Sequence, residues 1–241
     1  MTNVALLLAI MAAAPTSQSR AQRDAELDYL HVLATYAMCE VRENHARSAK
    51  AVLSNLDAHD LQRHFSDIFI EKPVAYVAGC RELVMPDGQA FFLKGEPLRM
   101  KLAEALVKAD LQNEVSTSFA DRAPLPFREP ETREELDRTL ADTRTESGRK
   151  HIQEFYDMRV AQSWLSHFGE CVARSDPARA HAWLLMKAGS AEDAAAANAL
   201  APAFGACLGE GQKLTVGKET LRGSVAVSYY RLAKAPPAVN P

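Results

Sequence analysis

The sequence predicts a mainly α-helical protein built from two fused, pseudo-symmetric helical repeats, each with a short strand-like segment and one internal disulfide. Three observations support this fold class. Glycine is scarce, with 11 residues in 241, while alanine is abundant, a balance that favours helices. Apolar residues recur at helical spacing in the clearest segments. Three blocks of sequence occur twice in the same order, and each copy contains two cysteines.

The duplication appears when Cys39 is aligned with Cys171 without gaps. This alignment also matches Leu33 with Leu165, Arg42 with Arg174, Ala46 with Ala178, Arg47 with Arg179 and Leu53 with Leu185. Further on, Cys80 meets Cys207 after a longer spacer in the first copy. The segments 88–106 and 211–229 then share a third block, in which Glu96, Leu98 and Arg99 match Glu219, Leu221 and Arg222.

These blocks set the expected organisation of the chain. We predict a signal peptide over 1–21, helical repeat 1 over 29–112, a linker and connecting helix over 113–160, and helical repeat 2 over 161–236. The first repeat is expected to contain, in order, a helix capped by Asn44 and ending at Leu53, a helical segment over His59–Ile70, the cysteine-bearing helix Pro73–Leu83, a strand-like segment Ala90–Leu93 and a final helix starting at Pro97.

The linker contains prolines at 124, 126 and 130, which predict a surface loop, followed by a charged helix from Glu131 that continues toward Trp164. The second repeat is expected to contain, in order, a helix over Ala161–Arg174, a helix capped by Asp176 with Pro177 at its first position, a helix opened by Ser190 and ending near Cys207, a strand-like segment Lys213–Val216 and a last helix capped by Thr220. The two strand-like segments are candidates for pairing into a small ribbon.

The N-terminal segment is typical of a signal peptide. Residues 4–14 form a continuous apolar run that is too short to span a bilayer, and small residues follow it. Cleavage after Ser19 or Ala21 would suit a signal peptidase. No Lys or Arg precedes the run, and a buried first helix is the alternative. We therefore expect a periplasmic or secreted protein with no membrane span after signal cleavage.

The four cysteines Cys39, Cys80, Cys171 and Cys207 predict two disulfides, because an even count in an exported protein indicates a disulfide framework. Pairing within each copy joins Cys39 to Cys80 and Cys171 to Cys207. Each bond would stabilise the fold by about 4 kcal/mol in the chain-entropy account. Four buried free thiols are the alternative.

The repeated polar residues are six arginines: Arg42, Arg47, Arg99, Arg174, Arg179 and Arg222. They would form twin anion sites on one interpretation and bridge helix ends on the other. We favour the structural interpretation, because a repeated scaffold needs repeated residues whereas active sites usually differ between copies. His59 and His64, with acidic neighbours, suggest a metal site, but residues five apart do not share a helix face well. We expect a solvated helix there and no metal site.

No catalytic residue can be identified, because the sequence contains no nucleophile motif, no glycine-rich phosphate loop and no distinct acid–base pair. We expect no cofactor. The net charge of -3 gives no attraction to nucleic acid. With 24% charged residues, the chain is also unlike a buried membrane bundle.

Two pairs of stretches carry a family resemblance. CVARSDPARA and LRGSVAVSYYRLA, with the looser CEVRENHARS and LRMKLAEALVK, resemble a family of uncharacterised exported alphaproteobacterial proteins with a duplicated, cysteine-containing helical repeat. The resemblance covers most of the mature chain and implies an exported, helical, disulfide-bearing fold without an established activity. The first copy departs from the pattern, since it lacks the Asp-Pro dipeptide.

Two functional hypotheses follow. The first is an exported, non-catalytic binding or interaction protein of the bacterial cell envelope, whose partner is an envelope protein or a small ligand. The second is a small periplasmic hydrolase or lyase with its site between the two repeats. A pocket at that seam lined by unrepeated polar residues would favour the enzyme, and a continuous exposed apolar groove would favour the interaction protein.

Overall fold

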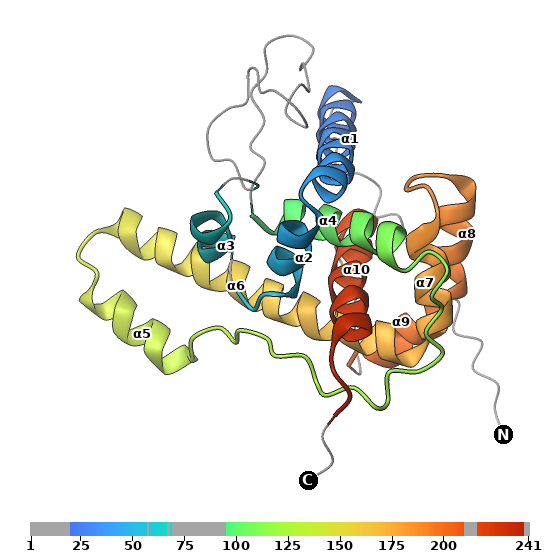
Figure 1. The fold of residues 1–241 in the computed structure, drawn as a ribbon. Coiled ribbons are helices and arrows are strands. Elements are labelled where there is room, and N and C mark those ends of the chain that lie inside the picture. Colours follow the sequence, from blue (N-terminus) through green and yellow to red (C-terminus); the bar gives the residue numbers. More distant parts are fainter. Residues whose placement is uncertain (1–19, 57, 67, 69–94, 210–215, 239–241) are drawn as a thin grey trace, which may run out of the picture.

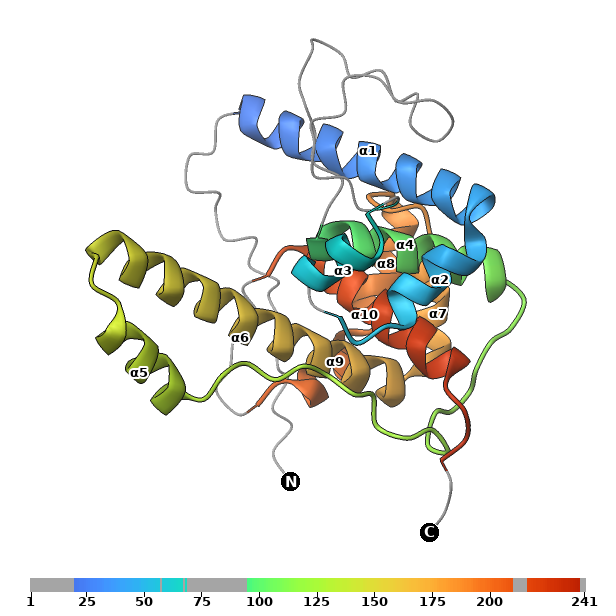
Figure 2. The ribbon, with the colours of Figure 1, turned by 60° about the vertical axis from the view of Figure 1, so that its left-hand side comes forward.

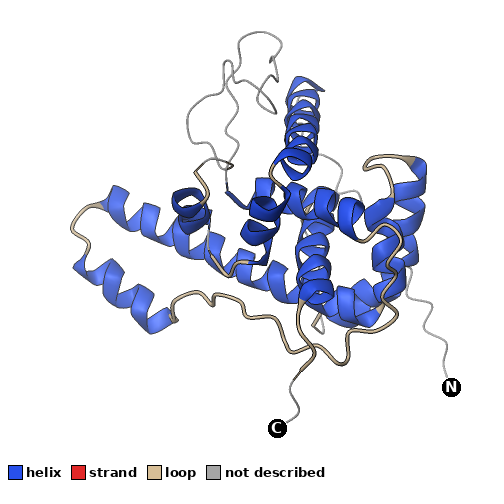
Figure 3. Cartoon of the chain, viewed as in Figure 1, coloured by secondary structure: helices blue, strands red, loops and turns tan. Residues whose placement is uncertain are grey.

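The computed structural model describes residues 20–56, 58–66, 68, 95–209 and 216–238. Every regular element among these residues is a helix (Figures 1 and 3). The helices are α1 (Arg20–Glu43), α2 (His45–Leu53), α3 (Ala58–His64), α4 (Gly95–Asp110), α5 (Arg133–Asp142), α6 (Glu146–Ser175), α7 (Pro177–Leu185), α8 (Ala191–Ala199), α9 (Ala201–Cys207) and α10 (Lys218–Lys234). The predicted mainly helical class is therefore confirmed.

Helices α4 and α10 pack against each other at the centre of the molecule. In two views α1 covers α4 on one side, and α6 packs against α10 on the other (Figures 1 and 2). All residues from Leu221 to Leu232 in α10 are buried, as are those from Leu98 to Val107 in α4. A helix buried on all sides must bury its polar side chains too, and these side chains then require partners.

Two glycines allow the central helices to approach closely. A Cβ atom on Gly223 of α10 would lie 2.5 Å from the Cβ of Met100 on α4. A Cβ on Gly169 of α6 would lie 2.5 Å from the carbonyl oxygen of Ser224. The packing of α10 against both neighbours therefore depends on glycine at these two positions.

Local capping signals predicted two helix starts correctly. The side chain of Asp176 accepts a hydrogen bond from the N–H of Arg179 at the start of α7. The side chain of Ser190 accepts one from the N–H of Asp193 at the start of α8. Helix α2 ends at Leu53, as expected.

Other boundaries differ from the predictions. Helix α10 begins at Lys218 after Gly217, rather than at Thr220. The helix expected to run to Cys207 is two helices, α8 and α9, that meet at Leu200, since Pro202 has no N–H to continue the first one. Asn44 precedes α2 without capping it, because its amide donates to the buried Glu40 instead.

The charged region after the linker forms two helices, α5 and the 30-residue α6, separated by residues 143–145, where a single connecting helix was predicted. As expected, the second of them continues through Trp164. The first half of α6 and α5 project together from the rest of the molecule (Figures 1 and 2). The linker between α4 and α5 runs in an extended path along α6, with one isolated antiparallel bridge between Arg122 and Pro237.

Several predictions lie outside the described residues. These are most of the signal segment, the helix Pro73–Leu83 with Cys80, and the strand-like segment Ala90–Leu93. Residues 213–215 of the second strand-like segment, Lys213–Val216, also lie outside them. Within the described ranges, no helix is both long and apolar enough to cross a membrane.

Candidate functional site

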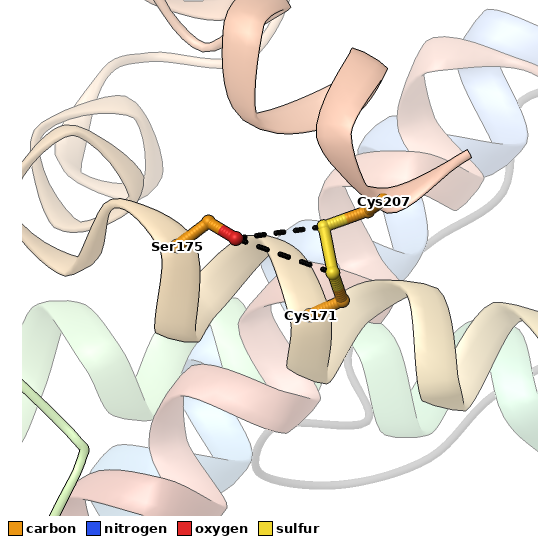
Figure 4. Close-up of a disulfide and its surroundings, with 3 residues drawn as sticks. All are labelled: Cys171, Ser175 and Cys207. Carbon is orange, nitrogen blue, oxygen red and sulfur yellow. Dashed lines mark hydrogen bonds between the residues drawn. A yellow bond between two sulfur atoms is a disulfide. The ribbon is translucent and has the colours of Figure 1, made fainter. Parts of the chain in front are cut away.

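The predicted disulfide between Cys171 and Cys207 is present and joins α6 to α9, with the Cα atoms 5.7 Å apart (Figure 4). The hydroxyl of Ser175, one turn later on α6, lies 3.6 Å from the Cys207 sulfur. The bond holds the short helix α9 against the end of α6. The second predicted bond, from Cys39 to Cys80, remains a prediction because Cys80 lies outside the described residues.

Arg99 and Arg222, which the sequence alignment pairs, make matching contacts. Each is buried and donates from Nη2 to two carbonyl oxygens at the end of a short helix: those of Val52 and Ser54 for Arg99, and those of Leu184 and Met186 for Arg222. These carbonyl groups have no partner within their own helix, so the guanidinium groups complete the ends of α2 and α7.

Arg222 also belongs to a chain of buried charges. Its Nε lies 2.9 Å from Glu104 and its Nη1 lies 2.6 Å from Asp193. Glu104 in turn binds Lys101, whose Nζ reaches Glu219 at 2.6 Å. Positive and negative groups alternate along the chain, so each buried charge has an opposite neighbour.

The pKa values in this chain show that its attractions exceed the cost of burial. Burial alone would raise the pKa of Asp193, but hydrogen bonds from Lys218 and Gly189 and the charge of Arg222 lower it overall. Burial alone would lower the pKa of Lys101, yet Glu104 and Glu219 raise it. Asp193 and Lys101 are therefore held in their charged forms.

Three of the remaining repeated arginines lie at exposed helix ends. Their partners are local or structural: Glu43 for Arg42, the carbonyl oxygen of His64 for Arg47, and Asp176 for Arg179. They are not gathered around a common point.

Arg174 fastens the linker to α6. Its Nε donates to Glu170, and its terminal nitrogens donate to the carbonyl oxygens of Phe119, Arg122 and Ala123. Glu170 also accepts from the N–H of Leu125. These bonds determine the path of the linker along α6.

A polar hollow of about 60 Å³ lies between α4, α6, α10 and the linker. We call it the arginine pocket, because the side chains that line it include those of Arg99, Arg128, Arg159 and Arg231. Glu96 is the carboxylate in its lining, and Gln162, Ser163, Ser166 and Asn55 add polar groups. The four arginines come from α4, the linker, α6 and α10, so tertiary folding brings them together.

Arg231 is, with Arg99, one of the two buried cations of the pocket. The residue is 5% exposed, and its Nη2 donates to the carbonyl oxygen of Pro126 at 2.8 Å. Among the described residues it forms no ion pair. The pKa of Arg231 is lowered to about 10, mainly by burial and to a smaller extent by the positive charge of Arg99. The pocket wall therefore holds two neighbouring buried cations that repel each other.

The other cations of the pocket are more accessible. Arg128 pairs with Asp60 at 3.2 Å. Arg159 donates weakly to the carbonyl oxygen of Glu129, at 3.4 Å, and forms no ion pair within the described ranges. The Nε of the buried Arg99 has no acceptor there either. Donor capacity therefore remains on three of the four guanidinium groups.

Glu96 is a carboxylate that has too few hydrogen-bond donors around it. Its side chain is 20% exposed, and its nearest cation is Arg99 at 3.7 Å. No donor in the described part of the chain forms a hydrogen bond with its carboxylate. Glu219, its counterpart in the alignment, accepts from Lys101 at 2.6 Å. The carboxylate of Glu96 is thus the less satisfied of the two.

A polar cluster borders the pocket where the linker crosses α6. The hydroxyl of Ser163 donates to one oxygen of Glu129, and His167 contacts the other, both at 2.7 Å. These contacts lower the pKa of Glu129. A catalytic triad needs the histidine between the nucleophile and the carboxylate. Here the carboxylate lies in the middle, so His167 cannot take a proton from Ser163.

Of the four pocket arginines, only Arg99 stands out in the sequence, through its match with Arg222. Arg128, Arg159 and Arg231 are aligned with no other arginine and have no common spacing, so no sequence signal connected them. His64 ends α3, and the side chain of His59 lies outside the described part; in the rest, no three potential metal ligands lie together.

Comparisons of the chain with protein-family models, with curated proteins and with solved structures found no match.

Proposed function

We propose that this protein is an exported, non-catalytic binding protein of the bacterial cell envelope, and that its arginine pocket binds the anionic group of a small ligand. The observation that carries the proposal is the convergence of four guanidinium groups on one small hollow. Three of these groups keep unused donor capacity. Guanidinium groups bind carboxylates and phosphates through paired, charge-assisted hydrogen bonds.

Export is supported by the Cys171–Cys207 bond and by the apolar run at 4–14. Disulfides persist in oxidising compartments and are rare in the cytosol. Cell fractionation tests this part of the proposal. Recovery of the uncleaved chain from the cytoplasm would contradict it.

We also propose that the two halves are duplicated copies. Helices α2 and α7 have the same length and the same offset as the aligned cysteines. Arg99 and Arg222 bind matching carbonyl groups, as described above. Helix α4 packs on α7, and α10 packs on α2 in return, as expected of a pseudo-twofold arrangement. The arginine pocket then lies where the copies meet.

A pocket at this seam whose polar residues, apart from Glu96 and Arg99, are unrepeated is also what a hydrolase or lyase would show. Its chemistry favours binding, because the bordering Ser163–Glu129–His167 cluster is in the wrong order to activate the serine. Apart from the carboxylate of Glu96, the unused groups of the pocket are hydrogen-bond donors with fixed positive charge. Such groups hold an anion without transferring a proton.

Calorimetric titration of the purified protein with inorganic phosphate and with propionate tests the proposal. We expect saturable binding at one site that weakens with added salt. Arg159→Gln should weaken it about tenfold or more, since it removes a charged donor. Arg138→Gln, on the exposed helix α5, is the matched control and should bind as the unaltered protein does.

Two results would overturn the binding proposal. One is the absence of heat and of thermal stabilisation with either anion. The other is unchanged affinity in Arg159→Gln. Arg231→Gln offers a second test, but it also removes the bond to Pro126, so its fold must first be checked by circular dichroism.

A further inference from the structure

The arginine pocket contains unsatisfied groups of both signs. Arg231 and Arg159 have donors to spare and no carboxylate partner among the described residues. The negatively charged group is the carboxylate of Glu96. It accepts no hydrogen bond within the described residues, and its nearest cation, Arg99, is 3.7 Å away. A simple anion would satisfy the arginines but would leave Glu96 without a donor and would be repelled by it.

A second, smaller hollow of about 20 Å³ adjoins the arginine pocket between α4, α6 and α10. The two share Glu96, Gln162, Ser166 and Val227, so the small hollow opens from the pocket at the position of Glu96. We call it the apolar annex, because Met100, Leu165 and Val227 form its apolar wall; three serines, Ser166, Ser224 and Ser228, complete the lining. It contains no cation, and its size suits one or two carbon atoms.

We infer that the ligand is a small, neutral α-amino acid, whose carboxylate binds Arg231 and Arg159, whose ammonium group binds Glu96, and whose short side chain enters the apolar annex. This inference rests on the function proposed above. It follows from three neighbouring subsites, cationic, anionic and apolar, that match the three substituents on one tetrahedral carbon. The combined size of the two hollows excludes large side chains.

Ligand comparison on the unaltered protein provides the first test. L-Alanine and propionate have the same carbon skeleton, but only alanine carries the ammonium group. We expect alanine to bind at least tenfold more tightly, since a hydrogen bond between charged partners contributes about that factor. N-Acetyl-L-alanine, which has no ammonium group, should lose this advantage. Equal affinities for alanine and propionate would overturn the inference while leaving anion binding intact.

The variant Glu96→Gln tests the anionic subsite. It should reduce the affinity for alanine about tenfold and leave propionate binding equal or stronger, because a repelling charge is removed. A parallel loss for both ligands would show that Glu96 acts only through its contact with Arg99. Glu96→Asp keeps the charge and should retain part of the preference for alanine.

Side-chain length tests the annex. From glycine to alanine to 2-aminobutyrate, each carbon buried should raise affinity about fourfold. Leu165→Phe narrows the annex and should abolish this gain without changing the affinity for glycine. Met158→Phe, an exposed substitution on the same helix, is the control. If neither amino acids nor simple anions bind, both this inference and the proposed function fail. If phosphate alone binds, only the inference fails.

Discussion

Arg222 and Asp193 form an ion pair in which neither side chain is exposed to solvent, with Nη1 of the arginine 2.6 Å from Oδ1 of the aspartate. The same carboxylate oxygen accepts a hydrogen bond from the indole N–H of Trp183. Because Arg222 also completes the end of α7, this pair ties α7, α8 and the central helix α10 together.

Removal of Asp193 should therefore destabilise the fold strongly. In Asp193→Ala, Arg222 and the Trp183 N–H remain buried without their acceptor, and we expect a loss of about 3–5 kcal/mol. Urea unfolding followed by circular dichroism measures it. Asp137→Ala breaks an exposed pair with Arg133 and should change stability by about 0.5 kcal/mol or less. Similar losses in the two variants would contradict this account of the buried pair.

The lowered pKa of Asp193 also predicts how stability depends on pH. A carboxyl group whose pKa is lower in the folded protein binds protons more readily when unfolded. Its contribution is therefore complete above the ordinary carboxyl pKa of about 4, and it is lost as the pH falls through the folded value. Unfolding free energies measured between pH 6 and pH 2 should decline less steeply in Asp193→Asn than in the unaltered protein. If the unfolding free energy fell equally steeply with pH in both proteins, the pKa of Asp193 would not be lowered by folding.

Glycine at the crossing of the central helices is expected to be essential. Gly223→Ala places a methyl group 2.5 Å from the Met100 Cβ and should cost about 1–3 kcal/mol of stability. In Gly205→Ala nothing lies within 4 Å of the new Cβ, and the helical position should gain about 0.5–1 kcal/mol. Thermal unfolding compares the two. A stable Gly223→Ala would show that α10 can move away from α4.

The disulfide between α6 and α9 should contribute substantially to stability. Replacing both Cys171 and Cys207 by serine opens a closed segment with a sequence separation of 36 residues. The chain-entropy account gives a loss of about 4 kcal/mol. Chemical unfolding of the double variant measures the loss, and a shift below about 1 kcal/mol would refute the expectation.

Peptide mapping without reduction tests the other predicted pair. We expect one peptide that joins Cys39 to Cys80 and another that joins Cys171 to Cys207. A peptide joining Cys39 to Cys171 would contradict pairing within each copy.

Features that depend on neighbouring residues could be predicted from the sequence. The caps at Asp176 and Ser190 are local hydrogen bonds between residues three apart, and their side chains bond in only a few ways. The helical class followed from composition and apolar spacing. The alignment also paired Arg99 with Arg222, and the two residues make matching contacts with helix-end carbonyl groups. The same local rules placed the start of the last helix at Thr220 instead of Lys218, and they missed the break at Leu200 that precedes Pro202.

The arginine pocket could not be predicted in this way. Arg231 meets the Pro126 carbonyl oxygen across 105 positions of the chain, and Lys101 meets Glu219 across 118. Such contacts depend on how closely α10 approaches α4, α6 and the linker, which the whole core determines. The sequence by itself determined the helices, the paired arginines and the Cys171–Cys207 bond. Only the tertiary structure decided which charged side chains lie close together, because residues far apart in the sequence become neighbours only when the backbone has folded.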